Sequence, residues 1–152
     1  MKKMHFWILL IIIGLVAFLV ILSIISRKKP STGLINGRLR PCSDRPNCVC
    51  SEDKELTSYV KPLTFSGNVK SNWERAKQII LEMGGKIMHE EDCYLWATFS
   101  TRIFRFVDDL ELRIDKDNGV IHIRSGSRVG YSDMGVNRRR VEDFRARFDQ
   151  SS

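Results

Sequence analysis

Residues 123–140 read I-R-S-G-S-R-V-G-Y-S-D-M-G-V-N-R-R-R and connect a predicted strand to the last predicted helix of the chain. Three glycines and five arginines fall within these eighteen residues, so the segment is too polar for a core to absorb. Glycines permit positive φ angles or close approach to a ligand, and the following helix would direct its free N–H groups at the loop. The glycines are Gly126, Gly130 and Gly135. Together with Arg124 and Arg128, this pattern is typical of an anion receptor.

A structural interpretation of the same segment stays open. In it, Asp133 or Ser132 caps the following helix, and the arginines pair with acidic residues upstream. Under the binding hypothesis, the candidate ligand-contacting residues are Arg124, Ser125, Ser127, Arg128, Tyr131, Asp133, Asn137 and Arg138, with Asp108 and Asp109 from an upstream strand. The run Arg138-Arg139-Arg140 is either a grip for phosphate or acidic lipid head groups or a solvated helix face.

Outward from this segment, the sequence predicts an α+β domain. Residues 94–101 alternate in polarity, and Asp117-Asn118-Gly119 is a strong hairpin turn. Strands are expected over residues 59–65, 86–90, 94–101, 104–114 and 120–124. A capping box at Ser71 and Glu74 begins a helix that ends at a glycine pair, and a second helix is expected over residues 136–148. We therefore expect an antiparallel sheet of about four or five strands with two helices packed on one face.

The N-terminal region differs sharply in composition from the rest of the chain. Residues 6–25 contain no charge and, as a helix, would span on the order of 30 Å, which is one bilayer. The run is longer than the apolar region of a signal peptide, so we expect an uncleaved anchor. Basic residues flank both of its ends, and their numbers do not decide the orientation. The expected organisation is an anchor over residues 1–29, a linker over 30–38 and a soluble domain over 39–150.

The net charge of +7 does not indicate a nucleic-acid-binding protein. Five basic residues flank the apolar run and no acidic residue precedes Asp44, so the region after Lys29 holds 20 basic against 18 acidic side chains. A duplex-binding surface would need charge clustered on the folded domain. We therefore expect a membrane as a partner and no nucleic acid.

The four cysteines are informative about compartment. Cys42, Cys48 and Cys50 lie in a proline-containing stretch predicted to be a rigid loop, and Cys93 is distant in sequence. Their spacing fits the paired thiolates of structural zinc sites poorly. Three disulfide connectivities, a zinc site and free buried thiols stay open, and we favour pairing Cys42 with Cys48 and Cys50 with Cys93. Disulfides persist in an oxidising compartment, which favours a domain on the outer side of the membrane.

Few residues offer reaction chemistry. Asp108 and Asp109 are adjacent and would point to opposite faces of a strand, so they cannot act as a carboxylate pair. The three histidines lack a metal-binding spacing, and no serine lies in a nucleophile elbow. No catalytic residue, metal or cofactor is therefore predicted, and whether the protein is an enzyme stays undecided.

The soluble part resembles a family known as domain of unknown function 1499, found mostly in bacteria. The resemblance covers about residues 39–148 and rests on L-R-P-C-S-D-R-P-N-C-V, on F-V-D-D-L-E-L and above all on the segment 123–140. It marks a signature set of Asp108, Asp109, Arg124, Ser125, Ser127, Arg128, Gly130, Tyr131, Asp133, Gly135, Asn137 and Arg138, with Cys42 and Cys48 in an N-terminal loop. It implies an envelope-associated protein and no settled activity. Cys50 stands where the resemblance implies Ser, and with Cys93 it suggests the second disulfide.

These observations predict a single-pass inner-membrane protein whose domain faces the periplasm. Its expected role is non-catalytic: the binding of an anionic small molecule or an envelope protein through residues 124–140. The alternative is a hydrolase or transferase acting on an envelope phosphate or ester. In that alternative Asp108 or Asp109 would be the base, and Arg124 and Arg128 would stabilise developing charge.

Overall fold

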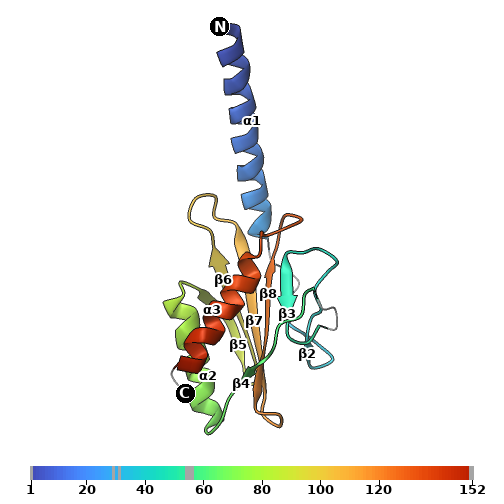
Figure 1. Cartoon of the computed structure of the whole chain (residues 1–152), viewed down its shortest axis with the longest axis vertical. Coiled ribbons are helices and arrows are strands. Elements are labelled where there is room, and N and C mark those ends of the chain that lie inside the picture. The colour runs from blue at the N-terminus through green and yellow to red at the C-terminus, as the bar shows by residue number, and fades with distance from the viewer. Residues whose placement is uncertain (1, 29, 31, 54–56, 151–152) are drawn as a thin grey trace.

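The structure is a computed structural model that describes residues 2–28, 30, 32–53 and 57–150 (Figure 1). Lys29, one of the basic residues that flank the apolar run, lies outside the described residues. In chain order the elements are α1 (Lys2–Ser26), β1 (Leu34–Ile35), β2 (Arg38–Leu39), β3 (Cys48–Cys50), β4 (Leu63–Thr64), α2 (Val69–Glu82), β5 (Lys86–Glu91), β6 (Tyr94–Ser100), β7 (Val107–Asp115), β8 (Val120–Ser127) and α3 (Val136–Gln150).

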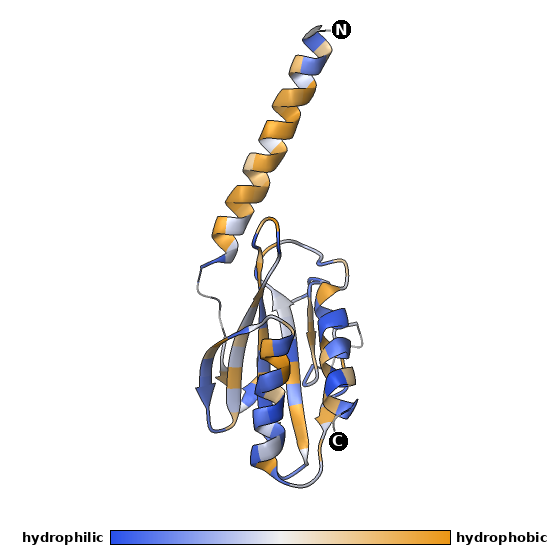
Figure 2. Ribbon diagram, turned by 90° about the vertical axis from the view of Figure 1, so that its left-hand side faces the viewer, coloured by the Kyte–Doolittle hydropathy of each residue, from blue (hydrophilic) through white to orange (hydrophobic). Residues whose placement is uncertain are grey.

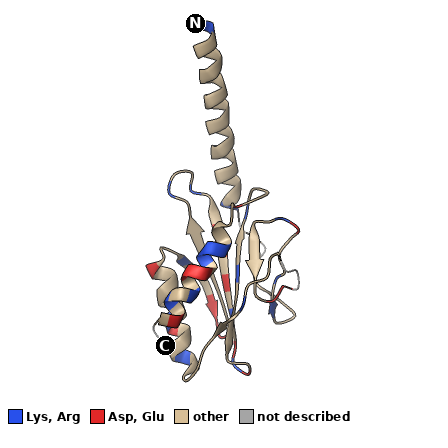
Figure 3. Cartoon of the chain, viewed as in Figure 1, with Lys and Arg blue, Asp and Glu red and all other residues tan. Residues whose placement is uncertain are grey.

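Helix α1 projects from one end of the domain as a single rod (Figure 1). It is apolar along almost all of its length (Figure 2), and between its N-terminal end and the domain it carries no charged residue (Figure 3). Among the described residues it is the one helix long enough and apolar enough to cross a membrane. Residues 34–39 form the short antiparallel hairpin β1–β2, which covers most of the predicted linker and the first residue of the predicted domain.

The main sheet confirms the predicted α+β class. Its strand order is β3-β8-β7-β6-β5, with β4 paired to the same edge of β8 as β3, and the pairs are antiparallel. The central hairpin β7–β8 turns at the predicted Asp117-Asn118-Gly119 and pairs Leu112 with Ile123 and Glu111 with Arg124. Because side chains alternate along a strand, the Leu112–Ile123 pair lies on one face of the sheet and the Glu111–Arg124 pair lies on the other.

Helices α2 and α3 both pack on one face of the sheet, as Figures 1 and 2 show together. The core there is apolar and fully buried, and its largest side chains are Phe144, Phe148, Leu63, Ile80, Leu95, Leu110, Leu112, Ile121 and Ile123. Trp73 is buried in this core, as its position on the apolar face of α2 predicts. Helix α2 begins one turn earlier than the predicted capping box, because Asn68 is the N-cap and accepts a hydrogen bond from the Ser71 amide.

The cysteine-containing stretch was predicted to be an irregular loop, and this is wrong for its last residues. Residues 48–50 form β3, whose side chains are all buried, because they extend the sheet along β8. Here Cys48 lies opposite Gly126, which is a strand residue and not a turn glycine; a β-carbon at that position would approach the Cys48 sulfur to 3.3 Å.

One predicted disulfide forms and the other does not. Cys42 and Cys48 are bonded, with their Cα atoms 5.6 Å apart. Cys50 and Cys93 are free within the described chain. Cys50 lies on β3 and Cys93 beside the start of β6, which is three strand spacings away, or about 14 Å at about 4.8 Å per spacing, whereas a disulfide needs Cα atoms within about 7 Å. Burial raises the pKa of the Cys50 thiol to about 11, so this thiol stays protonated.

Candidate functional site

The sheet face opposite the helices is here called the charged face. It holds Arg124 and Arg128, the first two arginines of residues 123–140. Arg128 directs two N–H groups at the Asp109 carboxylate, with Nε–Oδ2 2.8 Å and Nη2–Oδ1 2.7 Å. The indole N–H of Trp96 donates to the same carboxylate at 2.8 Å. Both side chains of the ion pair are less than a tenth exposed. Asp109 and Arg128 are therefore brought together, but as partners of each other.

A second ion pair lies beside the first on the charged face. Arg124 donates to Oε1 of Glu111 at 2.7 Å, while the Tyr94 hydroxyl and the Gly33 amide donate to Oε2 at 2.6 and 2.9 Å. Glu111 is fully buried. Burial and the hydrogen bond to Glu111 raise the pKa of Tyr94. Glu111 was missed as a functional candidate, although strand alternation places it on the same face as Asp109.

A third group continues the charged face under the β1–β2 hairpin. Glu52 accepts two hydrogen bonds from Arg113, at 2.9 and 3.2 Å, and one from the Leu39 amide at 2.7 Å. Burial alone would raise the pKa of Glu52, but these donors outweigh it and hold the pKa below its usual range. Burial lowers the pKa of His122, whose ring lies 3.2 Å from the Ser51 hydroxyl.

The helix face holds a separate polar cluster between the sheet and α3. Asp108 accepts from Arg140 at 2.7 Å, so the two adjacent aspartates point to opposite faces as predicted. Buried Asn137 accepts from the Ser125 hydroxyl at 2.6 Å and donates to the Ser127 hydroxyl at 2.9 Å. This cluster joins α3 to β8.

The loop between β8 and α3 is built largely as the structural interpretation predicts. Asp133 accepts hydrogen bonds from the amides of Gly135 and Asn137, at 2.9 and 2.7 Å, and so caps α3. Gly130 and Gly135 have positive φ angles of 88° and 78°, which glycine adopts without strain. Arg138 projects from the first turn of α3 and donates to the Thr57 and Tyr59 carbonyls, at 2.7 and 3.1 Å.

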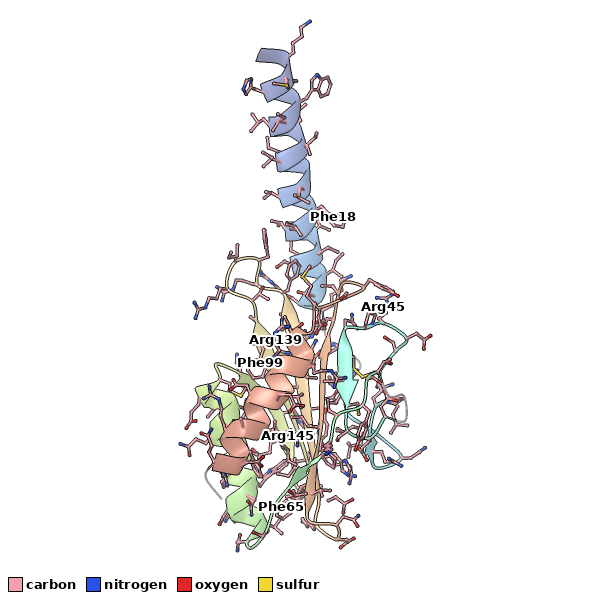
Figure 4. The ribbon with its side chains drawn as sticks, viewed as in Figure 1. Phe18, Arg45, Phe65, Phe99, Arg139 and Arg145 are labelled. Atoms are coloured by element: carbon pink, nitrogen blue, oxygen red, sulfur yellow. A yellow bond between two sulfur atoms is a disulfide. The ribbon has the colours of Figure 1, made fainter. Side chains whose placement is uncertain are left out.

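A cleft of about 640 Å³ lies between the start of α3 and the loop closed by the Cys42–Cys48 disulfide. Arg45, Tyr131 and Arg138 are among its lining residues. Arg45 is exposed and, within the described part of the chain, its guanidinium has no hydrogen-bond or ion-pair partner. In Figure 4 it extends from the domain at the end that faces α1. Sequence reasoning missed Arg45 because it lies outside the segment 123–140.

Two of the three acidic residues that line the cleft are occupied, and the third, Asp44, is exposed next to Arg45. Asp53 accepts from the Cys42 amide at 3.1 Å and from the Ser58 hydroxyl at 2.8 Å, and Asp133 caps α3. Hydrogen bonds from N–H and O–H groups offset the charge of Asp53 and Asp133. Of the two arginines that line the cleft, Arg138 already donates to backbone carbonyls, whereas the Arg45 guanidinium is unoccupied within the described part of the chain. Among the residues that the structure describes, no three His, Cys, Asp or Glu side chains gather as a metal site would require.

Comparison with known proteins gives one match. The family model described as "Protein of unknown function (DUF1499)" matches residues 38–148, which is most of the chain. No curated protein and no solved structure matches the chain. The matched residues contain the disulfide loop, the charged face, the polar cluster and every lining residue of the cleft.

Proposed function

The chain belongs to the DUF1499 family of proteins of unknown function, and from that premise we propose that its domain is a non-catalytic binding module. The ligand is an anionic group, a phosphate or carboxylate, on a small molecule or an envelope protein. The site is the cleft between the disulfide loop and α3, where Arg45 and Arg138 contact the anion and Tyr131 contacts the rest of the ligand. The bound group would have a bidentate fit to a guanidinium.

The unpartnered guanidinium of Arg45 carries this proposal. Three arginines of residues 123–140 are instead paired with carboxylates: Arg124 with Glu111, Arg128 with Asp109 and Arg140 with Asp108. Releasing any of them to a ligand would leave a buried carboxylate unpaired, at a cost of about 3–5 kcal/mol. Arg45 binds an anion without that cost.

The same ion pairs argue against the hydrolase or transferase alternative. A general base needs a carboxylate that can reach a substrate proton. Asp109 is engaged by Arg128 and Trp96, and Asp108 by Arg140. Neither lines the cleft. We therefore do not propose a reaction.

The proposed location is the outer side of a cell membrane, the periplasmic side of the inner membrane in a two-membrane envelope. Helix α1 serves as the anchor, and the Cys42–Cys48 disulfide is of the kind that persists in an oxidising compartment. Arg45 lies at the anchor's end of the domain (Figure 4), so ligands at the membrane surface are within its reach.

Anion titration of the full chain in phosphatidylcholine nanodiscs tests the proposal. Inorganic phosphate is one arm, and nanodiscs containing phosphatidylglycerol are the other, which separates free anions from lipid head groups. Because a ligand that binds the folded state stabilises it, we expect the Tm of the domain to rise in at least one arm. Arg45→Glu should abolish the rise.

Lys116→Glu is the matched control, because it reverses one exposed charge in the β7–β8 turn, at the other end of β7 from the anchor. This variant should keep the full rise in Tm. An equal rise in Arg45→Glu and in the parent chain would contradict the site, and no rise with either anion would contradict anion binding.

A further inference from the structure

The end of the domain that faces the anchor carries the most exposed of the domain's large apolar side chains. Outside α1, the three most exposed large apolar residues of the described chain are Met134, Ile103 and Tyr131, at 86%, 84% and 72%. Ile103 lies in the β6–β7 loop, and the other two lie in the β8–α3 loop. Both loops rise toward α1 in Figure 1. Single exposed apolar residues are ordinary, but a group of this kind at one end marks an interaction surface.

The last turn of α1 is docked to the domain, and this fixes where a bilayer surface would fall. The Val107 amide donates to the Ser26 hydroxyl at 3.2 Å, and Arg128 donates to the Ser26 carbonyl at 3.1 Å. Ser26 is fully buried by these contacts. The apolar run ends one residue earlier, at Ile25, and the first charged residue is Arg27. The boundary between hydrocarbon and head groups therefore lies at the level of the docked turn.

The two loops extend beyond that boundary along the anchor. A cavity of about 340 Å³ is lined by Leu22 of α1 together with Phe106, Val129 and Met134 of the loops. Leu22 precedes Ser26 by about one helical turn, or about 6 Å. The cavity therefore brings apolar side chains of both loops beside the last apolar turn of α1, while Asp108 and Asp133 line its other side.

The composition of the β6–β7 loop suits an interfacial position. Arg102 and Arg105 are exposed on either side of Ile103 and Phe104. Arginines at such a level keep their charge among head groups while their stems lie along apolar surface, and they are attracted by anionic lipids. Two hydrogen bonds close the base of this loop: the Thr101 amide donates to the Phe106 carbonyl at 3.0 Å, and the Phe106 amide donates to the Thr101 hydroxyl at 2.9 Å.

We propose that the β6–β7 and β8–α3 loops form a membrane-contact surface, with Ile103, Phe104 and Met134 inserted into the interfacial layer of the phospholipid bilayer that α1 crosses. The domain then lies against the bilayer and is not suspended from it by a free linker. This inference does not rest on ligand binding at Arg45.

Tryptophan quenching in the full chain tests the surface. Ile103→Trp and Met134→Trp each add one indole to the native Trp7, Trp73 and Trp96, and Lys116→Trp adds one at the other end of β7. Each variant is reconstituted into phosphatidylcholine vesicles with and without acyl chains brominated near the head group. We expect brominated lipid to quench more than half of the emission added at positions 103 and 134. The emission added at position 116 should be unaffected by brominated lipid and quenched by aqueous acrylamide.

The two test positions lie in different loops, so one misfolded variant leaves the other as the test. Added emission that is quenched by acrylamide and not by brominated lipid, at either correctly folded position, would overturn the proposal. Quenching of Ile103→Trp and Met134→Trp by lipid would support it even if the chain binds no anion.

Discussion

The two faces of the sheet bury different chemistry from the same strands. On the helix face, Leu112 and Ile123 pack into an apolar core under Phe144. On the charged face, their sequence neighbours Glu111 and Arg124 form an ion pair. Apolar packing tolerates changes of shape, whereas a buried charge depends on one partner at one distance. The polar residues of the family signature that lie on the sheet are therefore used to build the domain, and the cleft is the proposed binding site.

The largest expected effect breaks the charged face while sparing the helix face. Arg124→Met keeps the volume of the side chain but leaves fully buried Glu111 without its cation, so we expect a loss of about 3–5 kcal/mol in the free energy of unfolding. Ile123→Val, at the neighbouring position on the other face, should cost about 1 kcal/mol. Urea unfolding of the full chain in detergent micelles, followed by tryptophan fluorescence, measures both. Equal losses would remove the distinction between the faces.

A smaller effect concerns the Cys42–Cys48 disulfide, which lies at the β3 edge of the sheet. Reduction of the Cys42–Cys48 disulfide should cost about 2 kcal/mol, because it releases a loop of a few residues in the unfolded chain. Cys93→Ser should show the same loss on reduction, since Cys93 is a free thiol. Cys42→Ser/Cys48→Ser should show none. Unfolding with and without reductant measures the three losses, and a larger loss in the parent than in Cys93→Ser would restore a role for Cys93.

The smallest expected effect is a dependence on pH that belongs to the charged face. Burial lowers the pKa of His122 below its usual value of 6.5, so the unfolded chain binds the proton more readily than the folded one. Stability should therefore be highest above about pH 6.5 and should fall as pH drops toward the lowered pKa, by at most about 1.4 kcal/mol per pH unit. His122→Asn should flatten this part of the stability profile between pH 5 and 7.5, as measured by urea unfolding at about half-unit steps. An unchanged slope would assign the pH dependence to other groups.

Much of the fold follows from the sequence because its periodicities are local. Alternation over residues 94–101, the Asp117-Asn118-Gly119 turn and the apolar face of α2 each predict their own element. Strand β3 was missed because three residues beside two prolines carry little periodicity. Its pairing with β8 is set by tertiary contact. The Cys50–Cys93 pairing failed for the same reason, because strand order decides how far apart the two thiols lie.

The candidate site was predictable in its residue types and not in its partners. The sequence identifies the arginines of residues 124–140 and places Asp108 and Asp109 on opposite faces. It does not pair Arg124 with Glu111, since register between strands determines which charges meet. Arg45 is an unremarkable loop residue in the sequence. It becomes a candidate only because Arg124, Arg128 and Arg140 are paired with carboxylates in the structure.

A double-mutant cycle between Asp109 and Arg128 tests the central claim that the signature arginines on the sheet are structural. Arg128→Met, Asp109→Asn and the double variant are compared with the parent by urea unfolding of the full chain, and Asp109→Asn keeps an acceptor for Trp96. We expect a coupling of about 1–3 kcal/mol, so that the second change costs far less once the first is present. Additive losses, within about 0.3 kcal/mol, would show that Arg128 does not depend on Asp109 and would return it to the set of ligand-binding residues.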